Sequence, residues 1–206
     1  MQSKQHWEQV YKTKDATSVS WFQEHARQSM ELIRLTGVAR NGGIIDVGGG
    51  ASTLVDDLLA DGYSNVAVLD LSEAALAAAR QRLGARAQQV SWLIGDITQF
   101  DLPQHAYAVW HDRAVFHFLT TAEEREAYVR VVLRAVRPGG HVIVATFAQD
   151  GPEKCSGLPV MRYSADGLHA EFGAPFTLLR HEREEHHTPA GAVQKFIYCM
   201  CRKESN

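Results

Sequence analysis

Short apolar runs and amphipathic stretches alternate along most of the chain. The apolar runs lie at residues 42–48, 65–70, 89–96, 107–112 and 141–147, and they predict buried strands. Between the runs, apolar positions recur with helical spacing. Because helices separate successive strands, we expect a parallel sheet with right-handed crossovers.

Capping residues mark several of the expected helices. Ser72 stands before an Ala-rich stretch that Gly84 ends. Thr121 and Glu124 have the spacing of a capping box, which predicts a helix over 122–136. A Pro-Gly-Gly turn should end that helix before the fifth strand begins.

The last third of the chain breaks the alternation. A short helix is predicted over 164–172, and strands over 176–184 and 193–201 are joined by a turn that contains Pro and Gly. Because no helix separates these two strands, they should pair antiparallel. The predicted fold class is α/β: a Rossmann-like, doubly wound sheet of seven strands, mostly parallel, with an antiparallel last strand.

Length, composition and charge suit one domain and narrow its partners. The chain has 206 residues, of which 45% are hydrophobic and 22% charged, and its net charge is −3. We expect a single domain over 1–206, with a helical N-terminal segment (1–40) before a sheet core (41–206). The charge argues against nucleic-acid binding, and no apolar run is long enough to span a membrane. The polar N-terminus lacks a signal-peptide stretch, so a cytoplasmic protein is expected.

A glycine-rich turn follows the first predicted strand. Ligands of open α/β sheets bind at the carboxyl ends of the strands, where this turn lies. Gly48, Gly49 and Gly50 let a ligand approach the backbone, and Ser52 can cap a helix whose first amides hold a polar group. Such a turn alone also serves as a plain connector, so its meaning depends on the residues around it.

Two carboxylates follow the next two strands. Asp70 ends the second strand and Leu71 follows it, and a carboxylate at this place can accept the hydrogens of two ribose hydroxyls. Asp96 ends the third strand and can accept a hydrogen bond from an adenine amino group, while Ile97 covers the ring. The alternatives are a surface carboxylate for Asp70 and an Asx turn for Asp96.

Together these features resemble the class I S-adenosylmethionine-dependent methyltransferases. The glycine turn, Asp70 and Gly95-Asp96-Ile97 match the first three motifs of that family, and Arg137-Pro138-Gly139-Gly140 matches the turn before its fifth strand. The resemblance covers about residues 6–202. It implies S-adenosylmethionine as the cofactor and methyl transfer as the activity. Ser52 stands in place of the usual third glycine, which a helix cap tolerates.

The N-terminal segment narrows the resemblance. Trp7, Tyr11, Lys12 and the Val-Ser-Trp-Phe run at 19–22 look like the opening of the elongation-factor 1A and citrate synthase lysine methyltransferases. In those enzymes the segment folds over the cofactor, which implies a lid over residues 1–40 with Trp21 at the cofactor.

The turn after the fourth strand leaves the acceptor open. Asp112-Arg113-Ala114-Val115 stands where the lysine enzymes typically carry Asp-Lys-Gly-Thr. Bacterial small-molecule methyltransferases share the general pattern. We expect a small acceptor, because no recognition domain is appended, with a protein lysine as the alternative. The oligomeric state stays open.

Candidate catalytic side chains follow the same strand. His111 and Asp112 should lie beside the sulfur of the cofactor, with His111 also contacting it, and either can act as a base for an acceptor that carries a proton. Asp112 has a structural alternative, a bond to Arg113 or to a neighbouring helix. His117 lies in an apolar stretch and is interpreted as a hydrogen-bonded structural residue.

The three cysteines and the His-rich segment 181–187 give no metal site. Cys155 should lie at the ligand edge of the sheet. The antiparallel last strand should carry Cys199 and Cys201 to the opposite edge, too far away to share an ion. The histidine spacing matches no standard zinc pattern.

Two other classes of protein use similar motifs. A nicotinamide-dependent oxidoreductase also has a glycine turn and an acid after the second strand, but Thr53 stands where its fingerprint needs a glycine. A non-catalytic module that keeps the cofactor pocket is the second alternative. The Asn/Asp-Pro-Pro-Tyr sequence of adenine methylation is absent after the fourth strand, which adds to the argument against a nucleic-acid acceptor.

Overall fold

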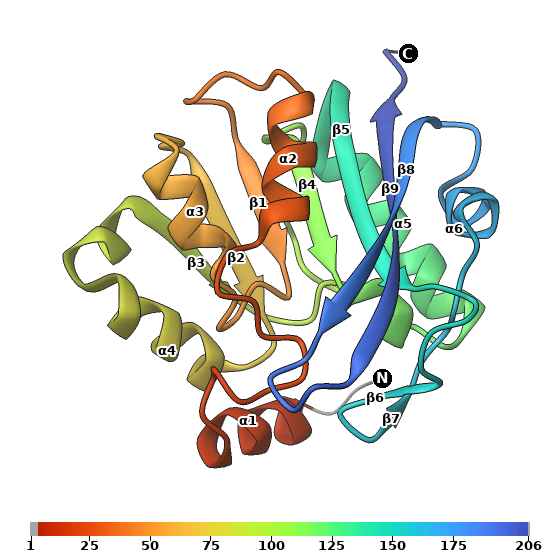
Figure 1. The fold of residues 1–206 in the computed structure, drawn as a ribbon. Helices are drawn as coiled ribbons and strands as arrows, with labels where there is room; N and C mark the ends of the chain where they lie inside the picture. Colours follow the sequence, from red (N-terminus) through yellow and green to blue (C-terminus); the bar gives the residue numbers. More distant parts are fainter. Residues whose placement is uncertain (1–3, 206) are drawn as a thin grey trace.

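The computed structural model describes residues 4–205 as a seven-stranded sheet with helices on both faces (Figure 1). Residues 1–3 and 206, which the predicted domain includes, lie outside the described residues. The strands follow the order β3-β2-β1-β4-β5-β9-β8 across the sheet. The strands are β1 (Ile44–Val47), β2 (Val66–Asp70), β3 (Val90–Ile94), β4 (Tyr107–Arg113), β5 (Val136–Phe147), β8 (Phe176–His187) and β9 (Val193–Lys203), and a separate hairpin holds β6 (Lys154–Cys155) and β7 (Leu158–Pro159).

Two hydrophobic cores lie on the two faces of the sheet. Alternate residues of a strand point to opposite faces, so Ile44 joins the first core and Ile45 the second. Strands buried on both sides need continuous apolar runs, which explains the sequence pattern. Helices α2 (Arg27–Leu35), α3 (Leu54–Ala60) and α4 (Glu73–Leu83) contribute to the first core, and α5 (Ala122–Ala135) and α6 (Ala165–Phe172) to the second.

The pairing pattern confirms the predicted fold class. Strands β1 to β5 pair parallel, whereas β9 runs antiparallel to both β5 and β8. In the β5–β9 register Cys199 pairs with Val144 and Cys201 with Val142, while Phe196 pairs with Phe147 at the carboxyl end of β5. Cys199 and Cys201 therefore lie away from the edge where the strands β1 to β5 end, as predicted.

The start of β5 differs from the prediction. Helix α5 ends at Ala135 and β5 already begins at Val136, so the Pro-Gly-Gly turn lies within the span of the strand. The cause is a bulge: two steps along β4, from Tyr107 to Val109, face five steps along β5, from Val136 to His141. Gly139 absorbs the extra length with a φ of +71°.

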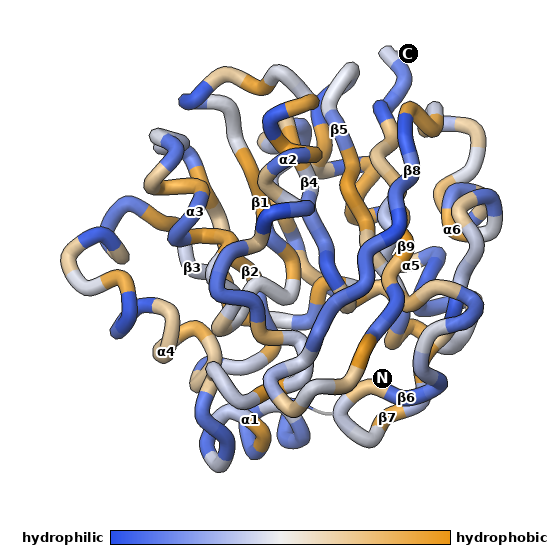
Figure 2. Tube along the Cα trace, in the orientation of Figure 1, coloured by the Kyte–Doolittle hydropathy of each residue, from blue (hydrophilic) through white to orange (hydrophobic). Residues whose placement is uncertain are grey.

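Strand β8 forms one edge of the sheet and is mostly hydrophilic along its length (Figure 2). Charged side chains on a long edge strand discourage pairing with another chain. Among the helices of residues 4–205, none combines the length and the apolar character that a bilayer span requires.

The N-terminal segment lies at the edge where β1 and β4 end. Helix α1 (Lys4–Thr13) is seen below the arrowheads of these strands in Figure 1, next to α4. Its Trp7 packs against the first core. The segment therefore covers the edge at which ligands of such sheets bind.

Candidate functional site

A cavity of about 980 Å³, counting its open mouth, lies at the carboxyl ends of the central strands. It combines strand ends with segments far away in the sequence. Its walls include the ends of β1 to β3 and the residues that follow them (Gly48, Asp70, Leu71, Asp96 and Ile97), the last residue of β4 with the turn after it (Arg113, Ala114 and Val115), the N-terminal segment (Trp7, Tyr11 and Trp21) and Cys155.

Asp70 is a buried carboxylate on the wall of this cavity. Its Oδ1 accepts a hydrogen bond from the Ser72 amide (2.8 Å). Burial raises the pKa of Asp70 to about 7, in spite of that bond. A Cβ atom on Gly50 would lie 2.5 Å from Asp70 Oδ2, so the glycine lets the loop approach the carboxylate. Asp70 thus presents an acceptor to a ligand in the cavity.

Asp96 combines the two roles considered for it. Its Oδ1 accepts hydrogen bonds from the Thr98 amide (2.9 Å) and the Thr98 hydroxyl (2.7 Å), which makes an Asx turn. Within residues 4–205 these bonds engage only Oδ1, so Oδ2 remains available to a ligand. Ile97 follows on the same wall and is buried.

A second cavity of about 550 Å³ adjoins the first and shares Tyr11, Trp21, Gly48 and Arg113 with it. Its walls carry the Asp46 carboxylate, while Arg113 lies at the junction with the first cavity. Asp46 Oδ2 is buried there and has no hydrogen-bond partner within the described part of the chain. The second cavity therefore suits a cationic group such as an ammonium. The other predicted residues on its walls are Gly49 and Ser52.

The glycine turn leaves room beside this carboxylate. A Cβ atom on Gly49 would lie 2.4 Å from Asp46 Oδ2. Ser52 does not start the next helix: α3 begins at Leu54 with Thr53 before it, and the Ser52 hydroxyl accepts the Leu54 amide (3.2 Å). The predicted cap is thus displaced by one residue, although the hydroxyl still satisfies an amide of the first turn.

His111 lies in the wall of the second cavity, not in the first. Its Nδ1 donates to Asp46 Oδ1 (2.7 Å), and its Nε2 accepts from the Ser29 hydroxyl (2.8 Å). Both ring nitrogens are therefore occupied, and His111 is almost fully buried. The geometry favours a role in orienting Asp46, and the predicted catalytic role of His111 stays a prediction.

Asp112 points to the opposite face of the sheet. It accepts hydrogen bonds from the Val115 amide (2.8 Å), the Phe116 amide (3.1 Å) and the Tyr128 hydroxyl (2.5 Å) of α5. It is fully buried and lines neither of the two cavities. Burial raises its pKa to about 6, although these donors favour the charged form. This geometry favours a positioning role that fixes the turn carrying Arg113, while its predicted catalytic role stays a prediction.

Replacing Tyr128 by Phe should destabilise the protein by about 1–3 kcal/mol. The variant removes a donor from the buried Asp112 carboxylate and an acceptor from the Trp110 indole, which lies 2.8 Å from the hydroxyl. Denaturant unfolding measures the loss. Tyr107→Phe is the matched control, since Tyr107 is buried but its hydroxyl has no hydrogen-bond partner within residues 4–205, and it should change stability by less than about 0.5 kcal/mol. Equal effects of the two variants would contradict the role given to Asp112.

Arg113 belongs to a buried cluster that the sequence did not predict. Its Nε donates to the Tyr198 hydroxyl (2.9 Å) and its Nη2 to Glu184 Oε2 (3.2 Å). The Tyr198 hydroxyl donates to the same Glu184 oxygen (2.9 Å), and the guanidinium stacks on the Phe196 ring at 4.1 Å. No local signal marks Glu184 or Tyr198, because only the pairing of β8 with β9 brings them to Arg113.

Aromatic rings from the N-terminal segment complete the first cavity. Trp7 packs edge-to-face against Trp21, with ring centroids 5.7 Å apart, and against Phe118 at 5.3 Å. The Trp21 indole donates to the Tyr11 hydroxyl (3.1 Å). All four rings line the cavity. The residues expected to form a lid are thus held against one another and against the turn after β4.

Two contacts tie the N-terminal segment to β8. Gln23 Nε2 donates to Glu184 Oε1 (2.7 Å), and His186 Nε2 donates to the carbonyl oxygen of Ser20 (2.7 Å). The same strand therefore holds both Arg113 and the segment that covers the cavity.

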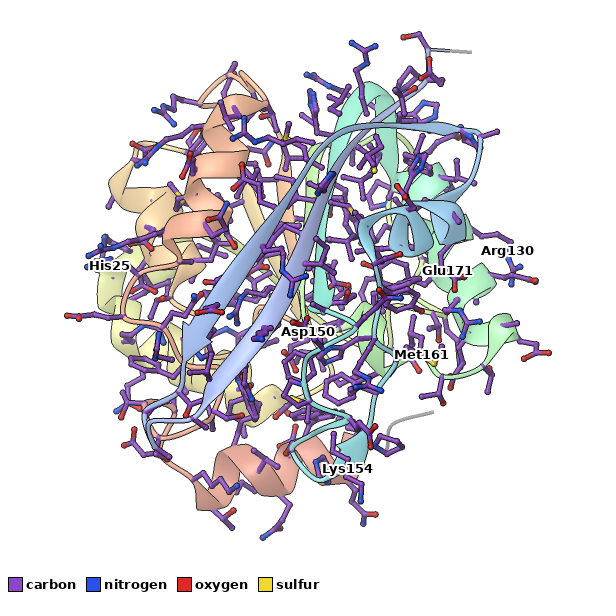
Figure 3. All side chains as sticks on the ribbon, turned by 45° about the vertical axis from the view of Figure 1, so that its right-hand side comes forward. His25, Arg130, Asp150, Lys154, Met161 and Glu171 are labelled. Carbon is purple, nitrogen blue, oxygen red and sulfur yellow. The ribbon has the colours of Figure 1, made fainter. Side chains whose placement is uncertain are left out.

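The loop after β5 and the hairpin that follows it are held by contacts with β8, β9 and α1. Asp150 binds Arg183 of β8 (2.5 Å) and Lys195 of β9 (3.1 Å), and Figure 3 shows it beside that hairpin. Lys154 begins the β6–β7 hairpin, which lies close to α1 in the same view, and His6 of α1 contacts the Ser156 hydroxyl (3.2 Å). These contacts bring Cys155 to the cavity wall.

The cysteines are free and buried. Burial raises the pKa of the Cys155 thiol to about 12, so this thiol stays protonated at neutral pH. His117, interpreted as structural, accepts a hydrogen bond from the Phe147 amide (3.3 Å), and burial lowers its pKa to about 3. No group of three or more His, Cys, Asp or Glu side chains in residues 4–205 is arranged to hold a metal ion.

Known proteins with similar sequences are methyltransferases. Residues 44–140 match a family model described as a methyltransferase domain. The eEF1A lysine and N-terminal methyltransferase of Mus musculus is 24% identical over 153 residues, which are 71% of this chain and 22% of that protein. The chain spans about a fifth of the length of the curated relatives it matches.

Solved structures share the fold. One solved structure comes from work on the conversion of a disulfide bond into a thioacetal group during echinomycin biosynthesis. It has a TM-score of 0.81 and 18% sequence identity, and the match covers 98% of this chain and 93% of the other. The Burkholderia thailandensis 1,6-didemethyltoxoflavin-N1-methyltransferase, solved with S-adenosylhomocysteine, has a TM-score of 0.67 at 19% identity, covering 98% and 84%.

The fold and the strand-end cavities define a Rossmann-like domain built to hold a ligand at the carboxyl ends of its strands. Residues 44–140 match a methyltransferase-domain model, and the fold is shared with solved structures of S-adenosylmethionine-dependent methyltransferases, which bears out the resemblance seen in the sequence.

Proposed function

We propose that this chain transfers the methyl group of S-adenosylmethionine to a small-molecule acceptor. The observation that carries the proposal is the pair of joined cavities at the strand ends, one with Asp70 on its wall and the other with the unpartnered oxygen of Asp46. A nucleoside fits the first arrangement and an ammonium the second. S-adenosylmethionine carries both groups at its two ends.

The adenosine half is assigned to the first cavity. Asp70 would accept the ribose hydroxyls, Asp96 Oδ2 would accept the adenine amino group, and Leu71 and Ile97 would cover the ring. The methionine half is assigned to the second cavity, with its ammonium at Asp46 Oδ2. The turn formed by residues 48–52 then faces the bend between the two halves. A Cβ atom on Gly48 would collide with Val115 and one on Gly49 with Asp46, so a side chain at either position would disturb these walls.

The protein supplies position and a dry environment. The bound cofactor brings an activated methyl group on a sulfonium ion. The chain must hold the acceptor in line with that group and exclude water. Trp21 and Tyr11 line both cavities at their junction, which supports the role of residues 1–40 as a lid. Residues 4–40, the described part of this lid, cover the edge of the sheet where the reaction would take place.

The small acceptor is supported by the enclosure of the first cavity. Helix α1, the β6–β7 hairpin and the turn after β4 all contribute to its walls. One structural neighbour is a 1,6-didemethyltoxoflavin-N1-methyltransferase, whereas the curated relatives are named for lysine and N-terminal methylation, which keeps a protein acceptor as the second candidate. The expected cytoplasmic location and the absence of nucleic-acid binding stay predictions.

Transfer of labelled methyl groups from S-adenosylmethionine into a bacterial extract separates the two candidates. We expect the label in the small-molecule fraction after filtration, and roughly tenfold less of it or lower with Asp70→Asn when the cofactor is below saturation. Label that remains with protein and resists unfolding would favour the lysine alternative. Absence of transfer with several extracts, although the cofactor binds, would favour the non-catalytic module.

Cofactor affinity should fall as the pH falls below about 7, by roughly tenfold per pH unit. The reason is that the ionised Asp70 binds the ribose, while burial raises the pKa of Asp70 to about 7 in the free protein. A proton then competes with the cofactor at lower pH. Calorimetric titration between pH 5.5 and pH 8.5, chosen to span about one unit or more on each side, measures the effect. Asp70→Asn should flatten the profile; an equally steep profile in that variant would assign the proton to another group.

A further inference from the structure

The part of the first cavity beyond the assigned adenosine residues has a wall of aromatic side chains. Trp7, Trp21 and Phe118 form a continuous wall through edge-to-face contacts of 5.7 Å and 5.3 Å. Leu119 and Val115 extend it with apolar surface. A wall of this kind favours a flat, apolar ligand, because aromatic rings pack against one another in offset or edge-to-face arrangements.

Among the described residues at this end of the cavity, no side chain is both unprotonated and placed to take a proton from the acceptor. Burial raises the pKa of Tyr11 and, to about 12, that of Cys155, so both stay protonated at neutral pH. Glu124 reaches the wall but is engaged in the capping box of α5. Of the imidazoles after β4, His111 lies in the second cavity with both nitrogens occupied, and His117 lines neither cavity.

Arg113 gives this end a positive charge. Arg113 lines both cavities at their junction, whereas its partner Glu184 lines neither, so the ion pair presents its cationic side to the ligand. An arginine has five N–H groups. Hydrogen bonds within the described chain engage three of them: the one on Nε to Tyr198, one on Nη2 to Glu184 and one on Nη1 to the Trp21 carbonyl (3.4 Å). The guanidinium therefore keeps donors for a further acceptor.

We infer that the acceptor is a planar aromatic compound whose nucleophilic atom is already an anion when it binds, with its ring against Trp7 and Phe118 and its charge towards Arg113. The inference rests on the proposed function and deepens it. The anion uses its lone pair to form a bond to the methyl carbon while the carbon–sulfur bond breaks, and the electrons of that bond stay with sulfur. No proton has to leave, which matches the lack of a base.

A lysine acceptor fits this end less well. An ammonium has to lose a proton before it can attack, and the charge of Arg113 would repel it on the way in. The aromatic rings alone could attract a cation through their faces. The sign of the charge that the cavity prefers therefore distinguishes the two acceptors.

Calorimetric titration of the enzyme saturated with S-adenosylhomocysteine tests the inference with three probes. Benzoate is aromatic and anionic, benzylamine is aromatic and cationic, and cyclohexanecarboxylate is anionic without an aromatic ring. We expect benzoate to bind roughly tenfold more tightly than either of the others. Arg113→Gln should abolish the preference for benzoate over benzylamine, and Arg113→Lys should retain most of it because the charge remains.

Arg40→Gln is the matched control. Arg40 also pairs with a carboxylate, Asp61 (2.9 Å), and also stacks on a ring, that of Tyr63 at 4.3 Å, but it precedes β1 and so lies at the opposite edge of the sheet. The control should leave the benzoate preference unchanged.

The outcomes separate the inference from the proposed function. If the wild type does not bind S-adenosylhomocysteine, the proposed function fails. If it binds this product but binds benzylamine as tightly as benzoate, or binds none of the probes at millimolar concentration, only the acceptor class is wrong. Loss of the preference in both Arg113 variants, with unchanged affinity for S-adenosylhomocysteine, would show that Arg113 acts through the shape of the site and would overturn its assigned role.

Discussion

Replacing Asp70 by Asn should weaken S-adenosylmethionine binding by roughly ten- to a hundredfold. A hydrogen bond to a charged group contributes about 1.5–3 kcal/mol, and the variant removes the charge that would hold the ribose. The shape of the side chain is retained, and the amide oxygen can still accept the Ser72 amide at the position of Oδ1 (2.8 Å). The fold should therefore survive, and calorimetry on the purified variant isolates the effect on binding.

Asp101→Asn is the control for this measurement. Asp101 is also paired, with Arg134, but its side chain is 90% exposed and lies outside both cavities. Its replacement should leave the cofactor affinity unchanged. An Asp70→Asn protein that is folded and binds the cofactor as tightly as the wild type would remove Asp70 from the site.

Gly48→Ala should have a second large effect, on both stability and binding. Gly48 has a φ of +69°, which costs a residue with a side chain about 1–2 kcal/mol, and its Cβ would lie 2.0 Å from Val115 Cγ2. Either the glycine turn or the turn after β4 must move. We expect the free energy of unfolding to fall by about 2–5 kcal/mol, and cofactor affinity to fall on the order of a hundredfold because both turns line the cavity.

Gly37→Ala separates the collision from the backbone strain. Gly37 has nearly the same φ, +67°, but a Cβ there would meet no atom within 4 Å. Its replacement should cost only the 1–2 kcal/mol of strain and should leave cofactor affinity intact. Equal losses of stability in Gly37→Ala and Gly48→Ala, with cofactor affinity kept in both, would show that a side chain at position 48 does not force the glycine turn away from Val115.

The sequence predicted the parts of the fold that local patterns determine. Apolar runs fixed the strands, and cap residues such as Ser72 and Thr121 fixed helix starts, because both depend on neighbours in sequence. The absence of a helix between the last two strands was enough to predict the reversed β9. The start of β5 was missed because a bulge depends on its pairing with β4.

Sequence motifs predicted the part of the site that lies at the strand ends. They did not predict the contacts that depend on the pairing of distant strands. The rule that alternate residues of a strand face opposite sides separates His111 from Asp112, so only one of them could have lined the cavities. That signal was present in the sequence. The contacts of Arg113 with Glu184 and Tyr198 were not, because they arise only when β8 and β9 fold beside β4 and β5.

A crystal structure of the protein with S-adenosylhomocysteine would show whether the two joined cavities hold the two halves of the cofactor, with its sulfur at their junction beside Gly48 and Arg113. We expect the ribose hydroxyls within hydrogen-bond distance of Asp70 and the ammonium within hydrogen-bond distance of Asp46 Oδ2. A ribose that lies away from Asp70, or a cofactor bound outside the two cavities, would contradict this placement of the cofactor.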